Sequence, residues 1–327
     1  MNNTKTNQSI LLVESNQFIR ESVIDSIQSN FPGTEAVGST GLAIEALRKK
    51  AFGLLILHIE GKYCFKFLEI CQSKYSDMKI ILIVSDDLKD HFSSIIKFPS
   101  IKNIIALRPT LSKNELLATV LLVFNNALFK VNLLVKNIPE TLRIEINDSK
   151  EKENHINTAS KFLNNFNLSA RLLRNILSTM DELIMNIIFN APTDTNGNRI
   201  YKDCARNEHI ILNNKQQGLL TINYSTQYIA ISAHDPFGSI DAHTVMSHLN
   251  KCFANKGKVD INPDSGSTGI GLYQMYQYSD FFIVSIQPQK STEFMVIFDL
   301  KINDRARSKY SKSLHFFEQN PANKETE

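Results

Sequence analysis

Short runs of purely apolar residues, separated by helical patterns, restrict the fold of the first 130 residues more than any other feature. Four such runs contain no polar side chain: Ile10–Val13, Leu54–Leu57, Ile80–Val84 and Ile104–Leu107. A strand without polar alternation is buried on both faces, as in a parallel sheet covered by helices. The intervening patterns predict helices over residues 17–29, 41–50, 63–74 and 111–130. The first half is therefore expected to be an α/β unit with a parallel sheet.

This order of strands and helices resembles the receiver domain of two-component response regulators over about residues 9–130. The resemblance implies a flavodoxin-like parallel fold. It also shows departures at the positions that carry the family's chemistry. Glu14-Ser15 stands where the family has two acids, and His58 stands where it has the phosphorylated aspartate. Ser85 keeps the family's hydroxyl, and Arg108-Pro109 replaces its Lys-Pro pair.

These replacements change what the first half can do. Aspartyl phosphorylation needs a carboxylate nucleophile and a metal held by further carboxylates. His58 supplies neither, and a protonated imidazole would repel Mg²⁺. An alternative is that His58 itself is phosphorylated. We rank this below the simpler interpretation, in which His58 is a histidine at a strand end without a chemical role. We therefore expect a pseudo-receiver that binds a partner through its sheet-end loops or its last helix.

The second half contains three polar motifs that together indicate a nucleotide site. Glu182 and Asn186 lie one turn apart on a predicted helix, so both point the same way. Their oxygens suit a hydrated Mg²⁺. Asp235-Pro236-Phe237-Gly238 directly follows an alternating strand. The glycine-rich turn 266–271 opens another helix, where backbone N–H groups can surround phosphates.

The motifs resemble the ATP-binding fold shared by gyrase and histidine kinases, in the small form found in anti-sigma factors, over about residues 140–302. The resemblance implies an α/β sandwich of the Bergerat type that binds ATP and Mg²⁺. Asn186 would ligate the metal and Glu182 would orient a water or act as a base. Asp235 would accept the adenine amine, with Gly238 and Thr292 beside it. The phosphates would lie against the turn that contains three glycines: Gly266, Gly269 and Gly271.

Each motif also has a simpler interpretation. Polar residues four apart are common on any solvated helix, and an aspartate after a strand is often a turn residue. The glycine-rich turn is a weaker match to a dinucleotide-binding fingerprint, because its spacing differs and no strand precedes it closely. We favour the nucleotide site because the three motifs occur in the order of the resembled fold.

Two functions follow. The first is an ATP-binding regulator of the anti-sigma or serine/threonine kinase kind, in which Glu182 takes a proton from a partner's hydroxyl. Lys256 and Lys258 could then neutralise charge, or simply be solvated. The second is a non-catalytic partner-binding regulator in which ATP is a structural or switching ligand, or is absent. An ordinary histidine kinase is disfavoured, because no phosphoacceptor module precedes the ATPase and His155 lies inside it.

Composition sets the remaining expectations. With 327 residues, 43% of them hydrophobic, the chain can build two cores, and we place the units at 1–130 and 131–302, followed by a basic polar tail at 303–327. The net charge of +3 does not favour nucleic acid. No signal core or membrane-length apolar run is present, so we expect a cytoplasmic protein. The expected partner is a protein, such as an anti-sigma antagonist or a sigma-like factor, with a homodimer as a further option.

Overall fold

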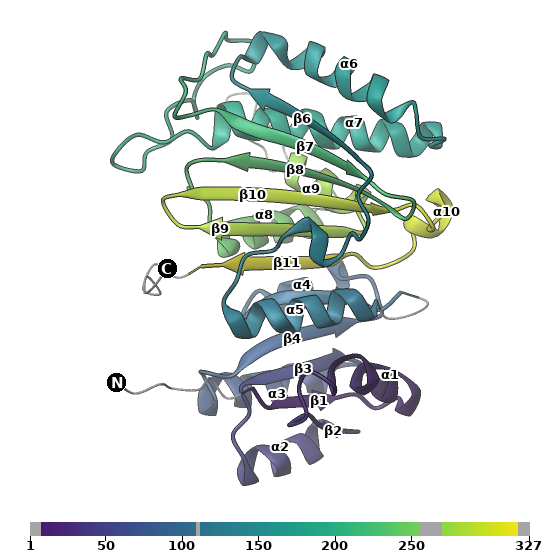
Figure 1. Cartoon of the computed structure of the whole chain (residues 1–327). Coiled ribbons are helices and arrows are strands. Elements are labelled where there is room, and N and C mark those ends of the chain that lie inside the picture. Colours follow the sequence, from purple (N-terminus) through teal and green to yellow (C-terminus); the bar gives the residue numbers. More distant parts are fainter. Residues whose placement is uncertain (1–7, 109–111, 256–269, 320–327) are drawn as a thin grey trace.

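The described strands form one mixed sheet that runs through the whole molecule. The computed structural model describes residues 8–108, 112–255 and 270–319. Figure 1 shows the first half of the chain at the bottom and the second half at the top, with β11 (Ser313–Glu318) between them. The strand order is β2-β1-β3-β4-β5-β11-β9-β10-β8-β7-β6.

The first half contains five parallel strands in the order 2-1-3-4-5, which is the flavodoxin-like doubly wound arrangement. The strands are β1 (Ile10–Val13), β2 (Glu35–Val37), β3 (Leu54–Ile59), β4 (Lys79–Val84) and β5 (Ile101–Ala106). The helices are α1 (Gln17–Ile27), α2 (Thr40–Lys49), α3 (Lys62–Lys74), α4 (Lys89–Ile95) and α5 (Lys113–Asn125). The α1 and α5 side chains cover one face of the sheet, and those of α2, α3 and α4 cover the other. The parallel sheet expected for this half is confirmed.

The second half is a largely antiparallel sheet with its helices on one face. Its strands are β6 (Glu140–Ile146), β7 (Gly218–Tyr224), β8 (Tyr228–Asp235), β9 (Phe281–Gln287) and β10 (Ser291–Asp299). The short helices η1 (Val131–Leu133) and η2 (Ser149–Glu151) flank β6. The covering helices are α6 (Lys152–Leu163), α7 (Ala170–Met185), α8 (Ala242–Ala254) and α9 (Ile270–Tyr278). The connection between the halves, residues 127–138, packs on the opposite face of this sheet.

Residues 304–318 differ from the expected basic polar tail. Residues Asp304–Arg307 form α10, and β11 pairs antiparallel with β5 and parallel with β9. The side chains of Leu314 and Phe316 are fully buried. The basic residues around β11 conceal its apolar content in the sequence, and burial of that apolar surface makes it a strand rather than a solvated tail.

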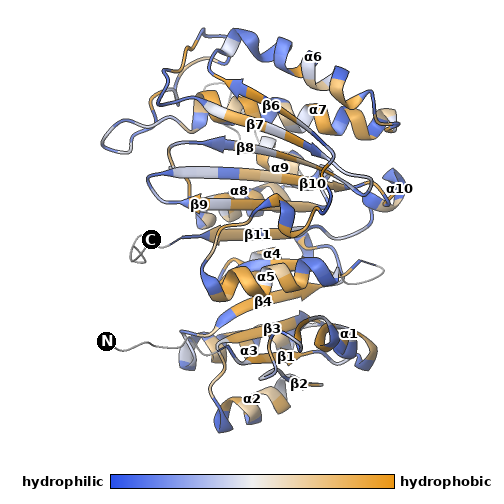
Figure 2. Cartoon of the chain, viewed as in Figure 1, coloured by the Kyte–Doolittle hydropathy of each residue, from blue (hydrophilic) through white to orange (hydrophobic). Residues whose placement is uncertain are grey.

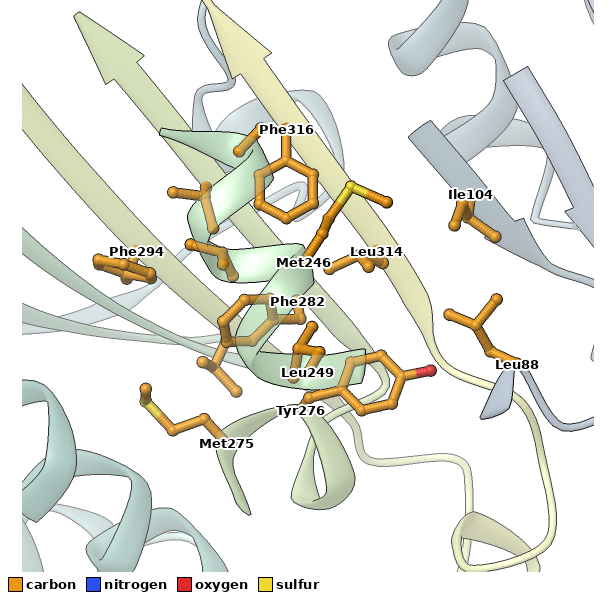
Figure 3. Packing of buried hydrophobic residues seen from close by; sticks show 14 of the residues in the cluster. Leu88, Ile104, Met246, Leu249, Met275, Tyr276, Phe282, Phe294, Leu314 and Phe316 are labelled. Carbon is orange, nitrogen blue, oxygen red and sulfur yellow. The ribbon is translucent and has the colours of Figure 1, made fainter. Parts of the chain in front are cut away.

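A single hydrophobic cluster continues from one half into the other. Figure 3 shows Leu314 and Phe316 of β11 with Ile104 of β5 on one side and Phe282 of β9 on the other. Met246 and Leu249 of α8 lie over the same strands. Figure 2 shows the hydropathy along the chain: the strands are mostly orange, while much of α6 is blue. The two halves therefore share a core as well as a sheet.

Several local features also differ from expectation. Strand β2 and helix α4 had no counterpart in the pattern, and α5 ends at Asn125, before the left-handed residue Asn126. The apolar residues 210–212 form no strand, and Ile211 makes one isolated bridge with Asp148. Within the described ranges, no helix combines the length and apolar character needed to cross a membrane.

Candidate functional site

Helix α7 packs over one face of the second-half sheet and carries Glu182, and Asn186 directly follows the helix. Ser169 caps the helix, its hydroxyl accepting a hydrogen bond from the Leu172 N–H at 3.0 Å. The apolar stripe of α7 is buried, whereas Glu182 and Asn186 are half-buried. The helix continues into a π-helix, η3 (Asn186–Asn190), and the Asn190 amide donates to Asn186 Oδ1 at 2.7 Å. π-Helical turns occur frequently at functional sites.

Glu182 lies against the start of α9. A Cβ at Gly271 would lie 1.9 Å from Glu182 Oε2, so a larger residue at this position would displace the carboxylate. Burial raises the pKa of Glu182, and the neighbouring Asp181 adds to the rise, while Arg206 and Lys152 oppose it. Glu182 and Gly271 are therefore adjacent, whereas Gly266 and Gly269 lie outside the described residues.

Asp235 and Thr292 face each other across two paired strands. Asp235 ends β8, and its register partner on β10 is Thr292. Both residues are buried, and Asp235 is only 5% exposed. Burial raises the pKa of Asp235 to about 6, although hydrogen bonds from the Phe237 N–H and the Thr292 hydroxyl oppose the rise. The Gly238 N–H also donates to Asp235. A carboxylate has about four acceptor positions, so Asp235 can still accept a further hydrogen bond.

Gly238 fixes the loop that follows Asp235. It has φ +61°, and a Cβ here would lie 2.1 Å from the Gln287 carbonyl oxygen in the β9–β10 turn. The Ser239 hydroxyl donates to the Ala191 carbonyl at 3.0 Å, which links this loop to the residue after η3. The structure thus brings the loop after Asp235 into contact with the segment that follows the Glu182 helix.

Sequence reasoning missed Arg206 as a neighbour of this site. Its guanidinium lies 5.0 Å from the centre of the Phe189 ring, and its charge opposes the rise in the pKa of Glu182. Arg206 belongs to the irregular segment between η3 and β7. An isolated basic residue in a loop gives no periodic or motif signal, so only the folded structure reveals this proximity.

In the first half, His58 occupies a pocket of carboxylates at the carboxyl end of the parallel sheet. Glu14 Oε2 lies 2.8 Å from His58 Nδ1, and Glu60 Oε1 lies 3.8 Å from the same nitrogen. The Ser85 hydroxyl lies 3.3 Å from Nε2 on the other side of the ring. Arg108 turns away from this pocket, because its side chain donates to the Asp280 carbonyl of the second half and covers the Phe281 ring.

The ligand atoms of Glu14, His58 and Glu60 lie within 4.8 Å of one another. One imidazole and two carboxylates suit a divalent transition metal better than Mg²⁺, which prefers an oxygen-only set. The side chains also complement one another without a metal, since His58 directly contacts Glu14. In the resemblance stated from the sequence, His58 would stand at the phosphoacceptor position, and an imidazole there cannot form an aspartyl phosphate.

Comparison with known proteins is informative only for the first half. No protein-family model and no curated protein matches the sequence. Solved structures match its N-terminal part, and they are response-regulator receiver domains. A receiver domain of an HD domain-containing protein from Pseudomonas fluorescens Pf-5 is 18% identical, with a TM-score of 0.33, covering 36% of this chain and 94% of that domain. A Thermotoga maritima response regulator is 14% identical, with a TM-score of 0.33, covering 36% of this chain and 98% of its own. A Vibrio cholerae chemotaxis response regulator is 18% identical, with a TM-score of 0.32, and the match covers 36% of this chain and 99% of that regulator.

Proposed function

We propose that this protein is an ATP-binding signalling regulator of the anti-sigma factor or serine/threonine kinase type, whose first half is a pseudo-receiver for a protein partner. The observation that carries the proposal is the buried carboxylate of Asp235, which ends β8 opposite Thr292. Burying a carboxylate is costly unless hydrogen bonds satisfy it. An adenine amine would supply a further donor to this carboxylate, and the pairing of Asp235 with Thr292 is what the resembled ATPases imply.

The other predicted residues suit the remaining parts of ATP. Asn186 Oδ1 accepts one hydrogen bond and has a second lone pair for Mg²⁺. The first turn of α9, which includes Gly271, presents backbone N–H groups that can bind a phosphate oxygen. Bound ATP with Mg²⁺ would supply a transferable phosphoryl group. The protein's own contribution is to hold the base at Asp235 and the metal at Asn186.

The arrangement of Glu182 favours the second candidate function, a regulator that binds ATP without transferring its phosphate. The Glu182 carboxylate packs against Gly271, so its position supports α9 rather than leaving it open towards a hydroxyl nucleophile. The positive charge of Arg206 also opposes the rise in the pKa of Glu182. A general base must reach the proton that it removes. Movement of α9 would therefore have to precede any catalytic role for Glu182.

Nucleotide titration of Asp235→Asn tests the binding proposal. The variant should bind ATP about 1–3 kcal/mol more weakly, because the buried amine donor loses its charged acceptor. Asp203→Asn provides a matched control, since Asp203 is exposed in the same half. Equal ATP affinity of wild type and Asp235→Asn by calorimetry would exclude the adenine role.

Measurement of phosphoryl transfer separates the two candidate functions. Labelled ATP is incubated with Mg²⁺ and candidate partner proteins, using wild type, Glu182→Gln and Asn186→Ala at matched folded fractions. For a kinase, Glu182→Gln should bind ATP normally and lose transfer, whereas Asn186→Ala should lose Mg²⁺-dependent binding as well. Binding by wild type without transfer to any partner would support the non-catalytic regulator.

A further inference from the structure

The pocket around His58 contains more negative charge than its neighbours balance. The carboxylates of Glu14 and Glu60 both approach Nδ1 of the imidazole. Within the described ranges, neither carboxylate forms an ion pair with a lysine or an arginine. Arg108 points into the second half, and the Arg20 guanidinium donates to main-chain carbonyl oxygens instead of a carboxylate. Two carboxylates therefore share at most one positive charge, that of a protonated imidazole.

Two atoms of this pocket lack a hydrogen-bond partner. His58 Nδ1 and Glu14 Oε2 lie 2.8 Å apart, yet neither makes a hydrogen bond to any residue in the described part of the chain. His58 is 5% exposed and Glu14 is 1% exposed. The second Glu14 oxygen, Oε1, accepts the Asn16 N–H at 2.8 Å. An unsatisfied buried carboxylate oxygen is costly, and a metal cation bound to both atoms would satisfy them together.

Neighbouring hydroxyl groups hold two side chains of the pocket in place. The Ser85 hydroxyl lies 3.3 Å from His58 Nε2. When Nε2 carries the proton and donates to this hydroxyl, Nδ1 presents the lone pair that a metal ligand needs. Glu60 accepts a hydrogen bond from the Ser15 hydroxyl at 2.6 Å and another from the Tyr63 hydroxyl. Such outer hydrogen bonds typically orient the ligands of a metal site.

We propose that Glu14, His58 and Glu60 bind a divalent transition metal ion such as Zn²⁺. Two ligand atoms that share one Zn²⁺ at about 2.1 Å each are at most about 4.2 Å apart. His58 Nδ1 meets this limit for both carboxylates, at 2.8 Å from Glu14 and 3.8 Å from Glu60. The three ligand atoms lie within 4.8 Å of one another, and a small movement of Glu60 at the exposed rim would complete the set. Water would occupy the remaining positions around the ion.

The Mg²⁺ ion that the resemblance to receiver domains implies does not suit this donor set. Mg²⁺ demands near-octahedral oxygen ligands, whereas an imidazole nitrogen favours Zn²⁺ and other transition metals. An ion bound here would connect Glu14, directly after β1, to the end of β3. Because the unfolded chain lacks a preformed site, the ion would stabilise the folded first half. The ligand of this pocket would then be a metal ion and not a phosphoryl group.

Calorimetric titration of the metal-free full chain with Zn²⁺, and separately with Mg²⁺, tests this site. Co²⁺ serves as a second probe, because its visible absorption reports the ligands around the ion. Glu60→Gln is the decisive variant, since Glu60 lies at the rim and its replacement should not prevent folding. His58→Gln removes the imidazole. The matched controls are Glu69→Gln, at an exposed position of α3, and His209→Gln, since the native His209 contacts Asp148 in the second half.

Wild type should bind a single Zn²⁺ ion more tightly than Mg²⁺. Glu60→Gln and His58→Gln should each weaken Zn²⁺ binding by about tenfold or more and change the Co²⁺ spectrum, whereas both control variants should match wild type. Asp235→Asn should also keep the full Zn²⁺ response, which separates this pocket from the proposed adenine site. Unchanged Zn²⁺ affinity in Glu60→Gln, or wild-type binding of Mg²⁺ as tight as that of Zn²⁺, would overturn the proposal.

Discussion

Asp235→Asn should make the unliganded protein more stable relative to wild type as the pH rises, although it should weaken nucleotide binding. Burial raises the pKa of Asp235 from 3.8 to about 6, so the folded state binds the proton more tightly than the unfolded state. Stability is therefore lost as the pH rises from below 4 to above 6. At about 1.36 kcal/mol per pKa unit, ionised Asp235 costs roughly 3 kcal/mol at pH 8 and roughly 1.5 kcal/mol at pH 5.

The asparagine removes this pH dependence but introduces an amide N–H₂ group that must find an acceptor. An unsatisfied donor costs about 1–3 kcal/mol at every pH, so the absolute change in stability at one pH is a poor test. The change in the relative stability of the variant between two pH values is a better test. The stability of the variant relative to wild type should increase by roughly 1.5 kcal/mol from pH 5 to pH 8.

Urea unfolding at pH 5 and pH 8 measures this difference, with Asp203→Asn as the exposed control that should show none. Groups shared by wild type and variant cancel in the comparison. A pH-independent difference between Asp235→Asn and wild type would refute the claim that Asp235 is held as a buried, costly carboxylate. Combined with weaker ATP binding, the expected result would identify a residue that serves ligand binding at the expense of stability.

Two further predictions concern the first half and the shared core. Acetyl phosphate with Mg²⁺ should leave residues 1–130 without an aspartyl phosphate, because His58 replaces the nucleophile; intact mass spectrometry that detects an acid-stable, base-labile acyl phosphate there would contradict this. Phe316→Ala should cost about 3–5 kcal/mol, since the side chain is 2% exposed, whereas Phe18→Ala, 81% exposed, should change stability by less than about 0.5 kcal/mol. Calorimetry should show both halves destabilised by Phe316→Ala; destabilisation of one half alone would contradict a common core.

The parallel sheet of the first half could be predicted because its central strands are buried on both faces. Each therefore appears as an uninterrupted apolar run, such as Leu54–Leu57. Strand β2 lies at the edge and is partly exposed, so it leaves no such run. Helix α4 has mostly polar residues, and it packs through Phe92, whose ring contacts Phe253 of the second half at 4.9 Å. A contact so distant in sequence leaves no local pattern.

The candidate site was predictable to the extent that its residues lie on regular elements. The spacing of Glu182 and Asn186 follows from the helical period, although the π-helix that begins at Asn186 does not. The pairing of Asp235 with Thr292 depends on strand register, which the resemblance indicated and periodicity alone did not. The contact between Glu182 and Gly271 depends on how two helices pack, so it could be stated only after the fold was known.

The polar residues beneath β11 explain how a strand from the end of the chain pairs with both halves in a single register. His315 contacts Asn103 of β5 at 3.2 Å and Glu115 of α5 at 3.0 Å, and all three side chains are buried. Neighbouring residues Leu314 and Phe316 point to the opposite, apolar face. A shift of β11 by one residue would exchange the two faces, placing His315 in the hydrophobic cluster and leaving Glu115 buried without its partner. Buried polar groups without partners are costly, whereas a buried ion pair adds little net stability over apolar residues of similar volume. The triad therefore acts mainly on specificity, since it disfavours every register except the one that joins β5 to β9.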